Sequence, residues 1–138
     1  MTAALPVPTV LLYCLRDPAR RQRILYWLER AGVRPVEVPP EDWQKPIGTL
    51  LGLPLFSPAE APAAEGAVEE EMLVMFAFRP GMLDAFLRFF REEGLAPVAL
   101  KAMATPTNLN WSSAALYRAL REEHHRLQAA AQKRSSLH

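Results

Sequence analysis

The feature that most constrains the fold is a strand–helix–strand pattern that occurs twice, 62 residues apart. The first copy covers residues 9–38 and the second covers residues 72–100. In each copy an apolar strand precedes a proline near the start of a helix, and a glycine follows the helix. Aligned without a gap, Leu11, Pro18, Leu25, Gly32, Pro35 and Val36 fall on Leu73, Pro80, Leu87, Gly94, Pro97 and Val98. The matching order of elements predicts a duplicated βαβ unit.

Each predicted unit continues into a loop, a tryptophan and a further helix. Trp43 precedes a short helix in the first unit, and Trp111 precedes a longer one that reaches about residue 132. We therefore expect one domain over residues 1–138. Its predicted parts are a first βαβα unit at 9–56, a Pro/Ala/Glu-rich linker at 57–71 and a second βαβα unit at 72–132.

The apolar content of the strands predicts their order in the sheet. Residues 9–15 and 72–78 are apolar almost throughout, as in strands buried on both faces, so they belong in the centre. Pro35 and Pro97 place the other two strands at the edges. The expected fold is α/β, with a four-stranded parallel sheet in the order 2-1-3-4. The alternative is a ferredoxin-like α+β fold with the order 4-1-3-2.

Strand direction decides where a site can form. In a parallel sheet all strand-to-helix loops meet at the carboxyl edge, and the switch point between strands 1 and 3 forms a crevice there. In the antiparallel alternative the loops of the two units lie at opposite ends of the sheet. A common crevice is therefore expected only for the parallel order.

Charge and cysteine content exclude several classes of function. The net charge is +1, so we expect neither nucleic acid nor a membrane as the partner. Six arginines lie in or beside the first helix: Arg16, Arg20, Arg21, Arg23, Arg30 and Arg34. We expect a solvated surface there, and the alternative is a patch that binds nucleic acid or an acidic partner. Cys14 is the single cysteine, which fits a reducing compartment. Without a signal peptide or a long apolar run, the expected location is the cytoplasm.

No pattern of metal ligands or cofactor-binding residues is present. His124 and His125 are adjacent, and neighbouring residues on a helix project about 100° apart, so the two imidazoles do not share a face. Glycine-rich phosphate loops are also missing. We therefore expect no metal and no cofactor, and we assign no catalytic residue.

The densest group of polar side chains lies in residues 101–112, between the last strand and the last helix. A lysine, several hydroxyl and amide groups and a helix start suit a phosphate or a carboxylate. A structural role accounts for the same residues, with Asn110 as the helix N-cap and the Thr107 and Asn108 side chains bonded to the loop backbone. The candidate ligand-binding residues are Lys101, Thr105, Thr107, Asn108, Asn110 and Ser112.

The same stretch carries a family resemblance. Leu100-Lys-Ala-x-x-Thr-Pro-Thr-Asn-x-x-Trp111, followed by a helix, resembles the DUF3783 family. The similarity covers roughly the second half of the chain. It implies a small bacterial protein of uncharacterised function, and it brings no catalytic residues with it.

Together these observations favour a non-catalytic binding or regulatory module. Its partner would be a protein or a small anionic ligand, contacted through residues 101–112. The alternative is a small enzyme that uses Lys101 with Asp17 or Asp42 in a carboxyl-edge crevice. A homodimer is a further option, because Phe89 lies at the margin of the apolar face of its helix.

Overall fold

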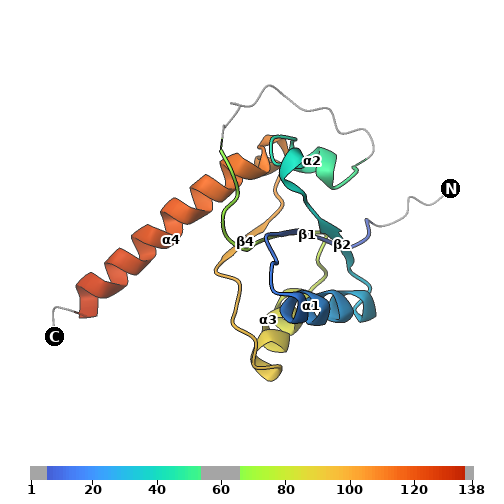
Figure 1. Cartoon of the computed structure of the whole chain (residues 1–138), viewed down its shortest axis with the longest axis horizontal. Coiled ribbons are helices and arrows are strands. Elements are labelled where there is room, and N and C mark those ends of the chain that lie inside the picture. The colour runs from blue at the N-terminus through green and yellow to red at the C-terminus, as the bar shows by residue number, and fades with distance from the viewer. Residues whose placement is uncertain (1–5, 54–65, 136–138) are drawn as a thin grey trace.

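The computed structural model describes residues 6–53 and 66–135, and these form an open sheet with helices on both faces (Figure 1). The elements in chain order are β1 (Thr9–Tyr13), α1 (Pro18–Arg30), β2 (Arg34–Glu37), the 3-10 turn η1 (Pro40–Asp42), α2 (Ile47–Leu50), β3 (Met72–Phe76), α3 (Met82–Glu92), β4 (Leu100–Met103), the 3-10 turn η2 (Asn108–Asn110) and α4 (Ser113–Ser135).

The sheet has four strands in the order β2-β1-β3-β4, which confirms the α/β class, the strand order and the central place of β1 and β3. The ferredoxin-like order was therefore wrong. The β1–β2 and β3–β4 pairs are parallel. The central β1–β3 pair is antiparallel, with Leu11 opposite Val74, so the expectation of a fully parallel sheet was also wrong.

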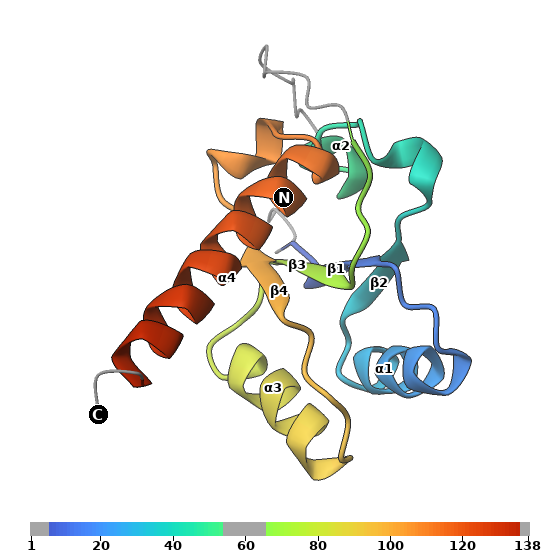
Figure 2. The same ribbon diagram turned by 60° about the vertical axis from the view of Figure 1, so that its left-hand side comes forward.

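Packing between helices explains this reversal. Each βαβ crossover is right-handed, and the two crossovers lead from the central strands to opposite edges of the sheet. Their helices lie on the same face of the sheet only if β1 and β3 run antiparallel. In the structure α1 and α3 do lie on one face (Figure 2). Trp27 of α1 stacks there on Phe86 and Phe89 of α3, with ring centroids 5.1 and 5.6 Å apart. An aromatic contact of this kind, which also buries apolar area, favours the reversed direction.

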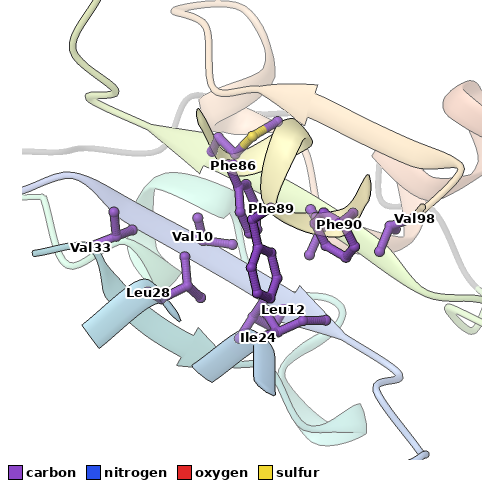
Figure 3. Packing of buried hydrophobic residues seen from close by; sticks show 11 residues of the cluster. Val10, Leu12, Ile24, Leu28, Val33, Phe86, Phe89, Phe90 and Val98 are labelled. Atoms are coloured by element: carbon purple, nitrogen blue, oxygen red, sulfur yellow. The ribbon is translucent and has the colours of Figure 1, made fainter. Parts of the chain in front are cut away.

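The alternation of side chains along the central strands divides the core into two layers. Val10 and Leu12 of β1 face α1 and α3, in the layer drawn in Figure 3. Leu11 and Tyr13 face the opposite side, where they pack with residues of α2 and α4. All four side chains are buried, as are Leu73, Val74 and Met75 of β3, so both central strands are covered on both faces, as their composition predicts.

The predicted linker lies partly outside the described residues, which resume at Gly66. From there the chain packs against the first unit. Val68 is fully buried, and its carbonyl oxygen accepts a hydrogen bond of 3.1 Å from the Cys14 Sγ. Glu71 accepts two hydrogen bonds of 2.9 Å from Arg20. Residues 66–71 therefore connect the two units through side-chain contacts.

Both central strands end in a residue with left-handed backbone. Cys14 follows β1 with φ of 59°, and Ala77 follows β3 with φ of 60°. This region is unfavourable for residues with a Cβ, so the coincidence reflects a shared strand-to-helix geometry in the two units. The shared geometry and element order agree with the predicted duplication, which itself stays a prediction.

Candidate functional site

The loop after β4 is organised around the buried side chain of Asn108. Its Oδ1 accepts a hydrogen bond of 2.8 Å from the Thr105 backbone N–H, and its Nδ2 donates one of 3.0 Å to the Met103 carbonyl oxygen. The Asn108 N–H donates to the Thr105 Oγ1 at 3.1 Å. The side chains of Thr105 and Asn108 thus hold the loop in shape, while Thr107 is exposed on its surface.

The start of α4 differs from the prediction. Ser112 is the cap, because its Oγ accepts a hydrogen bond of 3.1 Å from the Ala115 N–H, so the assignment of Asn110 as N-cap was wrong. The physical reason is that η2 uses Asn110, and the extended Trp111 separates that turn from the helix. The Trp111 carbonyl then accepts from the Ile47 N–H at 2.9 Å, which ties this loop to α2.

Lys101 points to the opposite face of the sheet. Leu100 and Ala102 belong to the core layer under α4, so strand alternation directs Lys101 toward α3. Its Nζ donates a hydrogen bond to the carbonyl oxygen of Val98. Burial lowers the pKa of the Lys101 ammonium. The structure thus separates Lys101 from the five other candidate residues of its stretch.

Lys101 instead lines a cleft between α3 and the segment that leads into β4. The cleft has a volume of about 620 Å³. Its floor is apolar and its rim is charged. The apolar lining residues are Leu87, Phe90, Leu95, Pro97 and Val98, and Gly81, Asp84, Arg88, Arg91 and Lys101 complete the lining. Three cations therefore surround this cleft, against one carboxylate.

Two of these cations are available for a ligand. Arg88 and Arg91 are exposed on α3, and neither has an ion-pair partner among the described residues. A guanidinium presents a planar set of donors that fits a carboxylate or a phosphate in bidentate fashion. Lys101 has three N–H donors and uses one of them on Val98. The cleft can therefore offer several charge-assisted hydrogen bonds beside an apolar surface.

The arginines at the first helix contrast with those of α3, because all six have a partner. Arg20, Arg21 and Arg23 pair with Glu71, Glu37 and Glu93. The guanidinium groups of Arg16, Arg30 and Arg34 donate to the Glu69 carbonyl, the Tyr26 hydroxyl and the Leu51 carbonyl. These contacts give this basic surface a structural explanation.

The carboxylates named for the enzyme alternative lie in the first unit. Asp17 caps α1 by accepting from the Ala19 N–H at 3.1 Å, and Asp42 pairs with Lys45 at 2.8 Å. Because β1 and β3 are antiparallel, the carboxyl ends of β1 and β2 lie at one end of the sheet and those of β3 and β4 at the other. The loops after β2 and β4 meet instead on the face of the sheet that α2 and α4 cover, through the hydrogen bond from the Ile47 N–H to the Trp111 carbonyl. The predicted carboxyl-edge crevice that would join these groups to Lys101 does not form.

Of the charged residues that line this cleft, sequence reasoning named Lys101 but not Arg88 or Arg91. Their signal was present in the helix pattern, because they sit at i and i+3 beside Leu87 and Phe90. Among the residues that the structure describes, no three His, Cys, Asp or Glu side chains are grouped as metal ligands. No helix within residues 6–53 and 66–135 is long and apolar enough to cross a membrane.

Comparison with known proteins identifies a similar family. Residues 71–127 match the model of a protein family described as a domain of unknown function, DUF3783. The matched region runs from the residue before β3 into α4, so it contains the whole lining of the cleft. The chain matches no curated protein and no solved structure.

Proposed function

We propose that this chain is a binding module, and that its ligand occupies the cleft between α3 and β4, which lies within the region that matches the DUF3783 family model. Its ligand is a small molecule or a chain end that joins an anionic group to an apolar body. The observation that carries the proposal is the position of Lys101, partly buried at the wall of an apolar cleft whose rim holds Arg88 and Arg91.

The two parts of the cleft suit the two parts of such a ligand. Leu87, Phe90 and Val98 offer apolar surface, and covering it contributes about 25 cal/mol for each Å² removed from water. The three cations would hold the anionic group. Attraction to Lys101 is stronger where the site is partly shielded from water, because the effective dielectric constant falls. A ligand with only one of the two parts should bind more weakly.

The composition of the lining favours binding over catalysis. The described residues that line the cleft include no His, Cys, Ser, Thr or Tyr, so it lacks a hydroxyl, thiol or imidazole nucleophile. Asp84 is the single carboxylate, and Lys101 is already hydrogen-bonded to Val98. The arginines and the lysine of the lining are residue types that bind and position an anion. The lining therefore does not support the enzyme alternative.

A thermal-shift titration with phenyl phosphate tests the proposal, since this probe joins an anion to an apolar ring. At 100 times its dissociation constant a ligand stabilises the folded state by about 2.7 kcal/mol. That corresponds to a rise of several degrees in Tm for a chain of this size. Inorganic phosphate and benzyl alcohol, which each carry one part of the probe, should give smaller shifts.

Two variants make the test specific to the cleft. Lys101→Gln removes the charge and keeps an N–H donor for the Val98 carbonyl, so we expect the shift to be lost while the unliganded Tm changes little. Lys45→Gln removes a lysine that pairs with Asp42 in the first unit and should keep the full shift. Equal shifts in wild type and Lys101→Gln would contradict the proposal, as would the absence of any shift in wild type.

A further inference from the structure

The second half of α4 extends away from the rest of the molecule. In Figures 1 and 2 the helix continues past the β4 side of the sheet. From Arg121 to Arg134 every residue is exposed except His124, which is half-buried. Isolated helices shorter than about 12–15 residues are marginal in water, so a projecting segment of this length gains stability from being covered.

One apolar side chain marks the uncovered side. Leu127 continues the stripe of Leu116 and Leu120 at helical spacing, yet it is 60% exposed. It lines a shallow groove of about 190 Å³ between the start of β4 and α4, together with Lys101, Leu120, Glu123 and His124. The groove offers a place for side chains from a partner beside the projecting helix.

The contacts of α4 with the body identify its outer flank. The Tyr117 hydroxyl donates to the Glu70 carboxylate at 2.7 Å, and Arg121 lies 3.8 Å from the same group. Tyr117 and Arg121 are one turn apart, so they define the inner flank. The residues on the other side of the Leu120–Leu127 stripe form what we call the outer flank of α4: Ala119, Glu123, Arg126 and Ala130.

The outer flank is complementary to itself. Its residues are spaced by four, three and four positions, so the spacing is the same in both directions. Along the chain the order is alanine, acid, base, alanine. In a reversed helix the order is alanine, base, acid, alanine. In an antiparallel pair of α4 helices Glu123 therefore lies level with Arg126 of the second copy, and Ala119 lies level with Ala130. The alanines allow close approach. Neither Glu123 nor Arg126 has an ion-pair partner among the described residues.

We infer that two copies of this chain associate through antiparallel pairing of their α4 outer flanks. A two-fold axis near the midpoint between His124 and His125 generates both ion pairs at once, as isologous interfaces require. The partner's helix covers Leu127 and the groove beside it. The charge pattern selects a second copy of this chain as the occupant. Lys101 lines both this groove and the cleft on the α3 side, but the inference does not depend on a ligand in that cleft.

Complementary charge-reversal variants test the inference in the full chain. Sedimentation velocity at about 1–100 μM should show a dimer for wild type and at least a tenfold weaker dimer for Glu123→Arg and for Arg126→Glu, since each variant faces like charges. An equimolar mixture of the two variants should dimerise again, because the arginine introduced in one variant then faces the glutamate introduced in the other. Restored association also demonstrates that both variants are folded.

The control is Gln128→Arg, which adds a positive charge at an exposed position on the opposite side of the helix from the outer flank. It should dimerise like wild type. Three results would overturn the inference: a wild type that stays monomeric at 100 μM, reversal variants that dimerise as tightly as wild type, or a mixture that remains monomeric. A monomeric wild type would show that the projecting helix serves a different partner.

Discussion

The hydroxyl of Tyr13 joins the core to the start of α4. It is buried, and it shares a hydrogen bond of 2.6 Å with the Ser113 Oγ. Burial raises the pKa of the Tyr13 phenol, while the bond to Ser113 lowers it by a smaller amount. The folded state therefore keeps a proton that the unfolded chain loses above about pH 10. The contribution of this group to the free energy of unfolding is therefore fully present below that pH and is lost as the pH rises above it.

We predict that the free energy of unfolding falls as pH rises above 10, with Tyr13 contributing up to about 1.4 kcal/mol per pH unit. Urea denaturation of wild type and Tyr13→Phe at pH 8 and pH 11 measures this. The variant should lose about 1 kcal/mol at pH 8, because Ser113 loses its partner, yet decline less at pH 11. Tyr26→Phe, at an exposed position, is the control. An equal decline in wild type and Tyr13→Phe would disagree with this explanation.

Ala77 carries backbone strain that glycine would relieve. A left-handed backbone costs a residue with a Cβ about 1–2 kcal/mol, and glycine costs about 0.5–1 kcal/mol through its freer unfolded chain. We therefore expect Ala77→Gly to stabilise the protein by roughly 0.5 kcal/mol in urea denaturation, the difference between these two effects. Ala85→Gly, inside α3, should destabilise it by about 1 kcal/mol. Similar losses in both variants would refute the strain argument.

Among the elements, the loop from β4 to α4 shows how far sequence reasoning can reach. The polar residues of the stretch were recognisable, and so was a structural role for Asn108. The threonine that bonds the loop backbone is Thr105, whereas Thr107 was expected. The side on which Lys101 emerges depends on the register of β4 with β3, where Lys101 lies opposite Leu73. The register of two strands cannot be predicted from the local sequence of one of them. Lys101 was therefore grouped with residues that lie on the opposite face of the sheet.

We predict that Asn108→Ala weakens the fold and leaves the cleft intact. The variant loses the bonds of the amide to Thr105 and Met103, at about 1 kcal/mol each, so the free energy of unfolding should fall by roughly 2 kcal/mol. The dissociation constant for phenyl phosphate, measured by calorimetry at a temperature where the variant is folded, should not change. Thr107→Ala, at an exposed position, should alter neither quantity. If folded Asn108→Ala did not bind phenyl phosphate, the binding site would lie in the loop between β4 and α4 and not in the cleft.

For the whole molecule, the order of elements and of strands followed from sequence, whereas strand direction did not. An apolar strand buried on both faces has the same composition in parallel and antiparallel sheets. The deciding contact, Trp27 against Phe86, joins residues 59 positions apart and is invisible to local periodicity. The cleft depends on the same packing, because Arg88 and Arg91 line it only when α3 lies beside the segment before β4.

The antiparallel centre makes the two units depend on each other. A fragment of residues 66–138 would expose the β3 edge that β1 covers, together with the faces of Phe86 and Phe89 that Trp27 covers. We predict that this fragment shows no cooperative thermal transition by circular dichroism at 5 μM, whereas the full chain does. A cooperative transition in a monomeric fragment would contradict this dependence.

The most direct test of the binding proposal is a titration of the ¹⁵N-labelled full chain with phenyl phosphate, followed by amide chemical shifts. The cleft predicts saturable shifts that are largest in residues 87–91 and 95–101, and their loss in Lys101→Gln. Saturable shifts centred on residues 105–113 would place the anion at the loop and the start of α4. Either that pattern or a spectrum unchanged at millimolar probe would contradict a binding cleft between α3 and β4.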